Sequence, residues 1–215
     1  MMAATQFISA PPLAERLPQP RGRLRFNVDV GARSWLKVGG RAEALFQPAD
    51  EADLAAFLAE TPSDVPVIAI GAGSNVLIRD GGLPGVVIRL GGPLAGISVD
   101  GLTITAGGGA LDLAVALTAQ DAGIGGLAFL SGVPGTIGGA IRMNAGAFGG
   151  ETSDCLQSAR AVGRDGRVHV VDAAELGFSY RRCGAPADWV FTLAVFVGAP
   201  TPKDEIAARI AEIKG

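Results

Sequence analysis

Short apolar runs separated by turn residues predict β-strands along most of the chain. The run Val65-Pro66-Val67-Ile68-Ala69-Ile70 is almost continuously apolar, which is typical of a strand buried on both faces of a sheet. Further strands are predicted at residues 44–47, 86–90 and 189–197. Two hairpins are predicted at residues 97–106 and 160–171, the first around a type I′ turn at Asp100-Gly101.

Apolar residues spaced three and four positions apart predict three amphipathic helices. They cover residues 49–60, 111–122 and 203–214. Asp50 is placed to begin the first helix, and Gly123 is placed to end the second as its C-cap. The glycine-rich stretch 123–150 has no period of 2 or 3.6, so no regular element is predicted there, and we expect its backbone to lie closely around a ligand. This mixture of elements predicts an α+β fold.

Charge and composition exclude several classes of protein. The chain has 215 residues, a net charge of −3 and no run of basic residues, so it lacks the basic patch of a nucleic-acid-binding protein. Glycines and Pro134 interrupt the one uncharged run of membrane-spanning length, and no membrane segment or signal peptide is predicted. Cys155, Cys183 and His169 are too few and too scattered for a zinc site, so we expect no metal and a reduced, cytoplasmic protein.

Two glycine-rich segments are candidates for binding an anion. The first, Gly71-Ala72-Gly73-Ser74-Asn75, directly follows the apolar strand, and its backbone N–H groups and side chains suit a phosphate, although a plain tight turn remains an alternative. Val76 stands where a dinucleotide fingerprint requires Gly, and no Lys follows a Gly as in a P-loop. The second runs from Gly132 to Gly146 and could enclose a cofactor, or it could be a crossover without a ligand. Together they suggest one long ligand with a diphosphate, such as FAD.

A third candidate is the segment Phe178-Ser179-Tyr180-Arg181-Arg182. Arg presents a planar fork that suits a carboxylate, a phosphate or a developing enolate, and the Tyr180 hydroxyl can donate a hydrogen bond beside it. An exposed Arg pair next to a half-buried Tyr is the alternative interpretation.

The order and spacing of five motifs resemble the UDP-N-acetylenolpyruvoylglucosamine reductase family over about residues 24–215. The motifs are Ser34-Trp35-Leu36-Lys37-Val38-Gly39-Gly40, Gly71-Ala72-Gly73-Ser74-Asn75-Val76-Leu77, Gly132-Val133-Pro134-Gly135-Thr136-Ile137-Gly138-Gly139, Asn144-Ala145-Gly146-Ala147-Phe148-Gly149 and Phe178-Ser179-Tyr180-Arg181. The resemblance implies a two-subdomain FAD-binding fold of the vanillyl-alcohol-oxidase/PCMH type.

The same resemblance implies a flavoprotein of peptidoglycan synthesis, and so of cell-wall formation, cell shape and division. NADPH would reduce a non-covalently bound FAD, and the flavin would then reduce UDP-N-acetylenolpyruvoylglucosamine to UDP-N-acetylmuramate. Arg181 matches the family's catalytic Arg, and Tyr180 would support it at the substrate site. The residues implied to bind FAD are Gly71, Ala72, Gly73, Ser74, Asn75, Val76, Gly132, Pro134, Gly135, Thr136, Gly138, Gly139, Asn144 and Gly146.

The family continues into a third domain that carries a proton-donating Ser and a Glu partner of the Arg. We therefore expect this chain to be the FAD-binding portion of a longer protein. We also expect a monomer rather than an oligomer. The expected organisation is a flexible lead-in at 1–22, FAD-binding subdomains at 23–90 and 91–200, and a helix at 201–215 leading to the absent domain. Two alternatives stay open: a non-catalytic flavin- or nucleotide-binding module that needs a partner chain, and another flavin oxidoreductase of the same fold.

Overall fold

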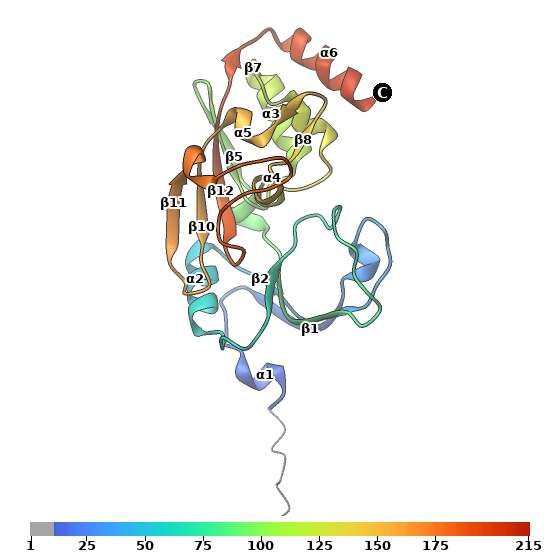
Figure 1. The fold of residues 1–215 in the computed structure, drawn as a ribbon, viewed down its shortest axis with the longest axis vertical. Helices are drawn as coiled ribbons and strands as arrows, with labels where there is room; N and C mark the ends of the chain where they lie inside the picture. The colour runs from blue at the N-terminus through green and yellow to red at the C-terminus, as the bar shows by residue number, and fades with distance from the viewer. Residues whose placement is uncertain (1–10) are drawn as a thin grey trace, which may run out of the picture.

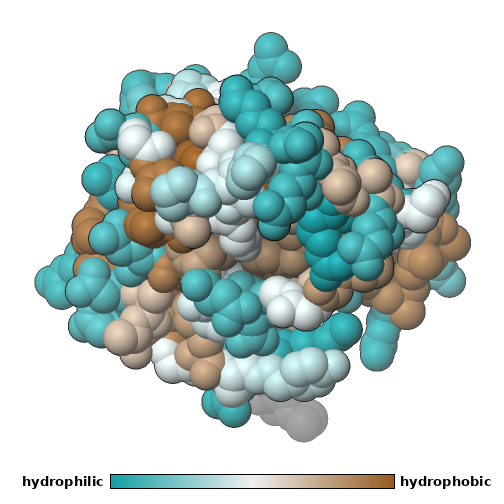
Figure 2. All heavy atoms as spheres, turned by 90° about the horizontal axis from the view of Figure 1, so that it is seen from above, coloured by the Kyte–Doolittle hydropathy of each residue, from teal (hydrophilic) through white to brown (hydrophobic). Residues whose placement is uncertain are grey.

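Two main β-sheets divide the chain in the computed structural model, which describes residues 11–215, and two further sheets have two strands each. Strands of the smaller sheet come from the first half of the chain, and those of the larger sheet follow them in sequence (Figure 1). Helices lie beside both sheets, so the predicted α+β class is confirmed. Polar and apolar side chains are interspersed on the face seen from the α6 end of the molecule (Figure 2).

The smaller sheet has four strands in the order β1-β2-β4-β3. Their bounds are β1 (Arg23–Asp29), β2 (Arg41–Gln47), β3 (Val67–Ala69) and β4 (Leu83–Ile88). β2, β4 and β3 run parallel, and β1 is antiparallel to β2. Helix α2 (Glu51–Glu60) covers the sheet, and its Phe57 stacks on Phe46 with ring centroids 4.0 Å apart. Asp50 begins this helix as predicted, because its carboxylate accepts a 2.8 Å hydrogen bond from the Asp53 N–H.

The larger sheet has five antiparallel strands in the order β11-β10-β12-β6-β5. Their bounds are β5 (Ile97–Asp100), β6 (Thr103–Gly107), β10 (Leu156–Val162), β11 (Val168–Asp172) and β12 (Val190–Val197). Helices α3 (Asp112–Ala122), α4 (Ile137–Met143) and α6 (Lys203–Lys214) contribute buried apolar side chains to the same core. Gly123 ends α3 in the left-handed conformation with φ +70°, which confirms the predicted C-cap.

Shorter elements connect these parts. They are α1 (Leu13–Arg16), α5 (Thr152–Cys155), β7 (Ile124–Gly125), β8 (Gly146–Ala147), β9 (Gly150–Glu151), β13 (Ala199–Pro200) and the 3-10 turns η1 (Gly31–Arg33), η2 (Gly92–Ala95), η3 (Ala128–Gly132) and η4 (Ala173–Leu176). The strands of the two sheets fall within the residue ranges 23–90 and 91–200 that the sequence suggests for two subdomains.

The apolar strand at 65–70 is wrongly predicted to be buried on both faces. β3 is the edge strand of its sheet, and Ile68 is 44% exposed. Residues 67–70 line a cavity, which explains why an edge strand is apolar.

Residues 123–150 contain a helix that the sequence pattern does not predict. Helix α4 has the sequence Ile-Gly-Gly-Ala-Ile-Arg-Met, in which two glycines lower the intrinsic helix propensity. Tertiary packing compensates, because Ile137 and Ile141 are fully buried in the core of the larger sheet.

The turn between β5 and β6 also differs from its predicted type. Asp100 pairs with Thr103, so Gly101 and Leu102 form the turn, and of these two only Gly101 has a positive φ. A type I′ turn requires positive φ at both positions, and the glycine at the first position is the pattern of a type II′ turn.

Residues 11–22, expected to be a flexible lead-in, are instead attached to the smaller sheet and to helix α2. Leu17 is buried in the core of the smaller sheet, and Arg16 forms an ion pair with Asp64 at 2.5 Å. The buried Asp53 carboxylate also accepts hydrogen bonds from the N–H groups of Arg21 and Gly22. The rest of the expected lead-in, residues 1–10, lies outside the described residues.

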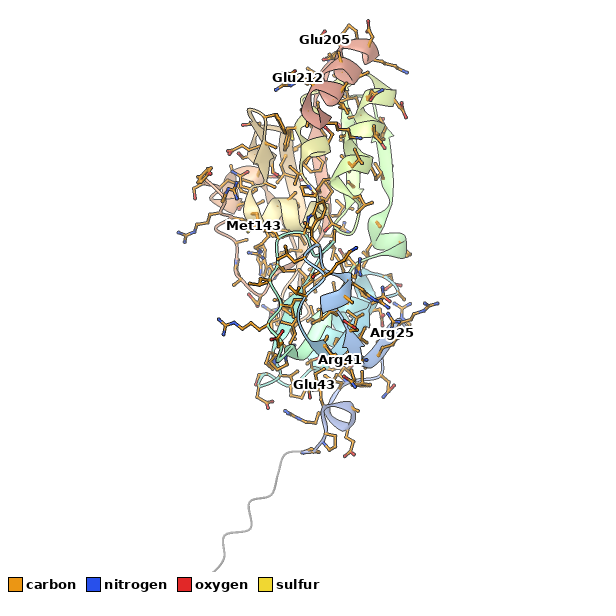
Figure 3. All side chains as sticks on the ribbon, turned by 90° about the vertical axis from the view of Figure 1, so that its right-hand side faces the viewer. Arg25, Arg41, Glu43, Met143, Glu205 and Glu212 are labelled. Carbon is orange, nitrogen blue, oxygen red and sulfur yellow. The ribbon has the colours of Figure 1, made fainter. Side chains whose placement is uncertain are left out.

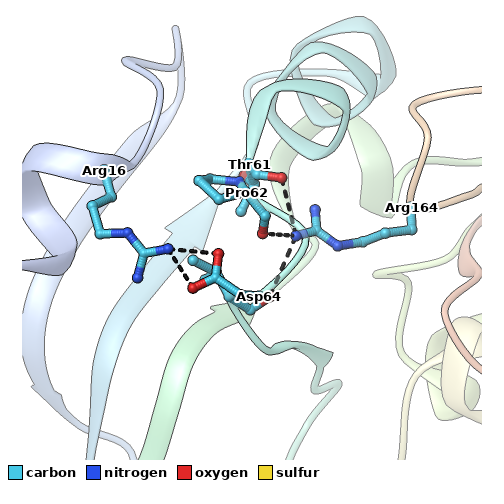
Figure 4. Close-up of polar contacts among 6 residues, drawn as sticks. Arg16, Thr61, Pro62, Asp64 and Arg164 are labelled. Atoms are coloured by element: carbon cyan, nitrogen blue, oxygen red, sulfur yellow. Dashed lines mark hydrogen bonds and ion pairs between the residues drawn. The ribbon is translucent and has the colours of Figure 1, made fainter. Parts of the chain in front are cut away.

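The Arg164 side chain joins the hairpin between β10 and β11 to the end of helix α2 (Figure 4). Its Nη1 donates to the Leu58 carbonyl at 2.8 Å, and its Nη2 donates to the carbonyls of Thr61, Pro62 and Val65 at 3.2, 2.7 and 3.3 Å. The last carbonyls of a helix lack partners within the helix, so this guanidinium caps α2 from the other sheet.

Replacing Arg164 with Ala is expected to lower the free energy of unfolding by about 2–3 kcal/mol, because carbonyls at the end of α2 lose a charged donor. The measurement is urea unfolding followed by circular dichroism. Arg167→Ala is the matched control: Arg167 lies in the same hairpin, its side chain is 81% exposed, and it pairs with Asp165 at 3.4 Å. If Arg164→Ala and Arg167→Ala lower the free energy of unfolding equally, the hydrogen bonds from Arg164 make no specific contribution to stability.

Candidate functional site

A cavity of about 620 Å³ lies at the junction of the two sheets and is the candidate site. Its volume is typical of sites for small molecules and cofactors. β3 and the loop after it form one wall, and residues 132–146 together with 187–191 form the other. Met143, another lining residue, lies near the level where the two sheets approach one another (Figure 3).

The first glycine segment, residues 71–76, follows β3 and is supported from behind by the loop after β1. The Gly73 carbonyl accepts a hydrogen bond from the Trp35 N–H at 2.9 Å, and a Cβ on Gly73 would lie 3.2 Å from the Ser34 Cα. Gly73 has φ +75°, a conformation that glycine adopts without strain. Within the described chain, no backbone N–H of residues 71–76 donates to another protein group, so these donors are available to a ligand.

The second glycine segment spans residues 132–146, and its first part, residues 132–139, leads from η3 into α4. The N–H groups of Gly135 and Thr136 likewise make no backbone hydrogen bond among residues 11–215. Gly138 lets α4 approach the larger sheet, because a Cβ at this position would lie only 3.1 Å from the carbonyl oxygens of Gly108 and Phe191. The Gly138 N–H donates to the Gly108 carbonyl at 2.8 Å. The second wall of the cavity is therefore attached to the body of the larger sheet.

The two glycine segments touch at Gly71 and Thr136. A Cβ on Gly71 would lie 2.3 Å from the Thr136 Oγ1, which is far inside van der Waals contact. A Cβ on Gly135 would lie 2.7 Å from Oδ2 of Asp112, a buried carboxyl at the start of α3. Glycine at these two positions therefore preserves the shape of the cavity wall.

Two arginines place positive charge at the cavity. The Arg181 guanidinium lines the cavity and makes no hydrogen bond or ion pair within the described residues. The backbone of Arg181 lies in a tight turn and has a φ of +52°. Arg142 stacks on the Phe191 ring at 4.9 Å and donates to the carbonyls of Ala185 and Trp189 at 3.0 and 2.8 Å. Arg142 therefore fixes the wall at 185–191, whereas Arg181 is available to a ligand.

Almost all site residues suggested by the sequence lie on this cavity. Those in its lining are Gly71, Ala72, Gly73, Ser74, Asn75, Val76, Gly132, Pro134, Gly135, Thr136, Gly138, Gly139, Gly146 and Arg181. Asn144 and Tyr180 are outside that lining. Tyr180 is 83% exposed, with its ring centroid 5.6 Å from the Arg181 guanidinium carbon.

Asn144 is buried and supports the turn that carries Arg181. Its Nδ2 donates to the Ser179 carbonyl at 3.3 Å, and its Oδ1 accepts from the Ser153 N–H at 2.9 Å. Its left-handed φ of +41° ends helix α4. Asn144 therefore holds the turn that carries Arg181 in place and does not line the cavity itself.

Sequence reasoning missed three charged residues of the cavity wall, Asp112, Arg142 and Asp188. Burial raises the pKa of Asp112 to about 8, yet its sequence position is that of an ordinary acidic residue in the first turn of a helix. Arg142 had a usable signal, because it is the only charged residue between Gly123 and Gly150.

His169, Cys155 and Cys183 lie away from the cavity lining. His169 stacks on Trp189 with ring centroids 4.3 Å apart, and both cysteines are buried. Over residues 11–215, no three His, Cys, Asp or Glu side chains gather in a way that could hold a metal ion. That same range contains no helix with the length and apolar character needed to cross a membrane.

The chain is similar in sequence to known proteins of one family. Residues 42–172 match the family described as FAD binding domain. The UDP-N-acetylenolpyruvoylglucosamine reductase of Azorhizobium caulinodans is 55% identical over 203 residues, and that of Paramagnetospirillum magneticum is 56% identical over 199. These alignments cover 94% and 93% of this chain but 66% and 65% of the relatives, so the chain spans slightly less than two thirds of their length.

A solved structure agrees with the sequence relatives. The crystal structure of UDP-N-acetylenolpyruvylglucosamine reductase (MurB) from Thermus caldophilus superposes with a TM-score of 0.77 at 33% identity, covering 91% of this chain and 69% of that one. This match confirms the FAD-binding fold that the motifs imply. The chain belongs to the UDP-N-acetylenolpyruvoylglucosamine reductase family and carries its FAD binding domain.

Proposed function

We propose that this chain binds FAD non-covalently in the cavity and serves the NADPH-dependent reduction of UDP-N-acetylenolpyruvoylglucosamine to UDP-N-acetylmuramate. This is a cytoplasmic step of peptidoglycan synthesis. The observation that carries the proposal is the pair of glycine segments that meet at the cavity. Several of their backbone N–H groups have no hydrogen-bond partner within residues 11–215. We take the working form to be a monomer that binds small molecules rather than nucleic acid or membrane.

The residues present suit FAD. A diphosphate needs several donors and close backbone approach, and residues 71–76 with Gly135 and Thr136 offer both. An isoalloxazine ring needs apolar walls, and Ile68, Val133 and Phe191 line the same cavity. Because His169 and both cysteines are outside the lining, a covalent attachment through them is not expected.

Arg181 is proposed as the catalytic residue of this chain. Reduction of the enolpyruvyl double bond takes a hydride and a proton. Bound FAD, once reduced by NADPH, would supply the hydride, and the third-domain Ser that the resemblance implies would supply the proton. The Arg181 fork would bind the enolpyruvyl carboxylate and stabilise the negative charge that develops beside it. The Arg181 fork is available to a ligand, because it has no hydrogen bond or ion pair in the described part of the chain, and Asn144 holds the turn that orients it. Tyr180, whose ring lies beside the guanidinium, would contribute to the substrate site.

A flavin titration tests the proposal. FAD added to the purified chain is expected to show a perturbed absorbance band and to elute with the protein on a sizing column. A folded chain that leaves FAD unbound at micromolar concentrations would contradict the proposal. In a chain extended by the third domain, FAD binding without oxidation of NADPH that depends on the UDP-sugar would support the alternative of a binding module that needs a partner chain.

In a protein that carries this chain together with the third domain, replacing Arg181 with Lys is expected to leave FAD affinity unchanged. UDP-sugar reduction is expected to slow by about 100-fold, because Lys keeps the charge but loses the fork. The readout is the rate of NADPH oxidation that depends on the UDP-sugar, beside the FAD dissociation constant. Arg182→Lys is the matched control, since Arg182 is the exposed neighbour outside the cavity lining. Similar rates in the two variants would remove Arg181 from the catalytic role.

A further inference from the structure

Asp112 is a buried carboxyl group that lacks a partner within the described chain. The residue has no exposed surface, and neither carboxyl oxygen accepts or donates a hydrogen bond. Its backbone is well fixed, because the Asp112 N–H donates to the Gly135 carbonyl at 3.2 Å. Buried polar side chains in folded proteins almost always have a partner, so an orphaned carboxyl needs a functional explanation.

Asp112 is part of the cavity wall at the place where the two glycine segments approach each other. The position that a Cβ would take on Gly135 lies 2.7 Å from the Asp112 Oδ2 and 3.8 Å from the Ser74 Oγ. The Asp112 carboxyl, Gly135 and the Ser74 hydroxyl therefore lie close together in the wall of the cavity.

The surroundings of Asp112 favour a neutral carboxylic acid. Burial raises its pKa to about 8. Residues 71–76, residues 132–136 and the neighbouring turn 107–111 carry no titratable side chain, and the charged groups that line the cavity elsewhere are Arg142, Arg181 and Asp188. A neutral carboxylic acid has one O–H donor, whereas an ionised carboxylate is only an acceptor.

We propose that Asp112 is a ligand-binding residue that donates its carboxylic O–H to a phosphate oxygen of the cofactor at the junction of the two glycine segments. This inference rests on the proposed FAD function. The Asp112 O–H completes the set of donors that residues 71–76 begin with their backbone N–H groups. A phosphate bound to those N–H groups would be repelled by an ionised Asp112 and would accept a hydrogen bond from a neutral one. The orphaned oxygens thereby acquire a partner.

Fluorescence titrations with FAD test this role in the full chain. Asp112→Asn keeps an N–H donor of similar shape and is expected to bind FAD like the unmodified chain at pH 7. Asp112→Leu removes the donor and is expected to weaken binding by about tenfold or more. Raising the pH from 7 to 9 ionises Asp112 and is expected to weaken FAD binding by about tenfold, whereas Asp112→Asn loses nothing over this range.

Two further ligands identify the accepting group. ADP contains the diphosphate without the flavin and is expected to show the same loss between pH 7 and 9, whereas riboflavin lacks phosphate and is expected to show none. Loss of riboflavin affinity over this range would place the acceptor on the ring or the ribityl chain and overturn the proposal. Thermal melts confirm that each variant unfolds cooperatively, and a merely structural carboxyl would shift the melt without changing the pH dependence of binding.

The outcomes separate the two proposals. If the unmodified chain binds FAD but Asp112→Asn shows the same decline with pH, the role of Asp112 is wrong while the FAD site stands. Unchanged affinity in Asp112→Leu at pH 7 has the same meaning. If the folded, unmodified chain binds neither FAD nor ADP, both proposals fail.

Discussion

Asp112→Asn is expected to make the chain more stable, by an amount that grows with pH up to about 5 kcal/mol between pH 4 and pH 8. The unpartnered carboxyl of Asp112 is fully buried, and burial raises its pKa to about 8. The unfolded chain loses the same proton near pH 4. Among residues 11–215, Ser131 Oγ is the only other buried side-chain oxygen or nitrogen without a hydrogen-bond partner.

The sign of this effect follows from proton binding. Below pH 4 the Asp112 carboxyl is protonated in both states and contributes no pH dependence. Between pH 4 and 8 the folded state keeps the proton that the unfolded state has released, so each pH unit lowers the free energy of unfolding by about 1.4 kcal/mol. Asn does not titrate, so the Asp112→Asn variant escapes this loss.

Urea unfolding at pH 5 and pH 8 measures the Asp112 effect. The difference in unfolding free energy between Asp112→Asn and the unmodified chain should be larger at pH 8. Asp121→Asn is the control, because Asp121 lies on the same helix with its side chain exposed, so that this variant removes a carboxyl from α3 without changing a buried group. A difference for Asp112→Asn that does not vary with pH would mean that Asp112 is ionised or hydrogen-bonded in solution.

Gly71→Ala is expected to reduce FAD affinity by about tenfold or more. The new Cβ would lie 2.3 Å from the Thr136 Oγ1, so either Thr136 must rotate or the two glycine segments must separate. Inserting a methyl group into a packed site costs about 1–3 kcal/mol. Because the two segments form opposite walls of the cavity, this strain falls on the cofactor site rather than on a sheet.

A double-mutant cycle distinguishes this clash from a general disturbance. Thr136→Ala removes the clashing oxygen, so Gly71→Ala should weaken FAD binding much less in a Thr136→Ala background. Gly81→Ala is the control: it is in the loop that follows, has open space where a Cβ would stand, and lies outside the cavity lining. Equal effects of Gly71→Ala with and without Thr136→Ala would show that the close contact does not determine binding.

The site residues that the sequence predicted lie in short contiguous segments of the chain. Both glycine segments are local features, because backbone freedom and exposed N–H groups depend on the residues of the segment itself. Arg181 was found through its motif and lines the cavity. By contrast, Asn144 belongs to a motif yet is buried beside the cavity, where its amide holds the turn that carries Arg181.

Several features depend on partners that are distant in sequence. The apolar run at β3 indicates a strand, but only the order of the sheet places it at an edge facing a cavity. Helix α4 forms despite two glycines because Ile137 and Ile141 are buried. The capping of α2 by Arg164 joins residues about 100 positions apart, so no local pattern could reveal it.

By itself, the amino-acid sequence determined the α+β class, most strands and helices, the two glycine segments and the family to which their order belongs. These properties depend on hydrophobic period, turn chemistry and backbone freedom, which act over a few neighbouring residues. Only the tertiary structure decided that Asp112 is buried without a partner and that Gly71 touches Thr136. Burial and contact are properties of segments brought together by folding, and the pKa of Asp112 follows from that packing.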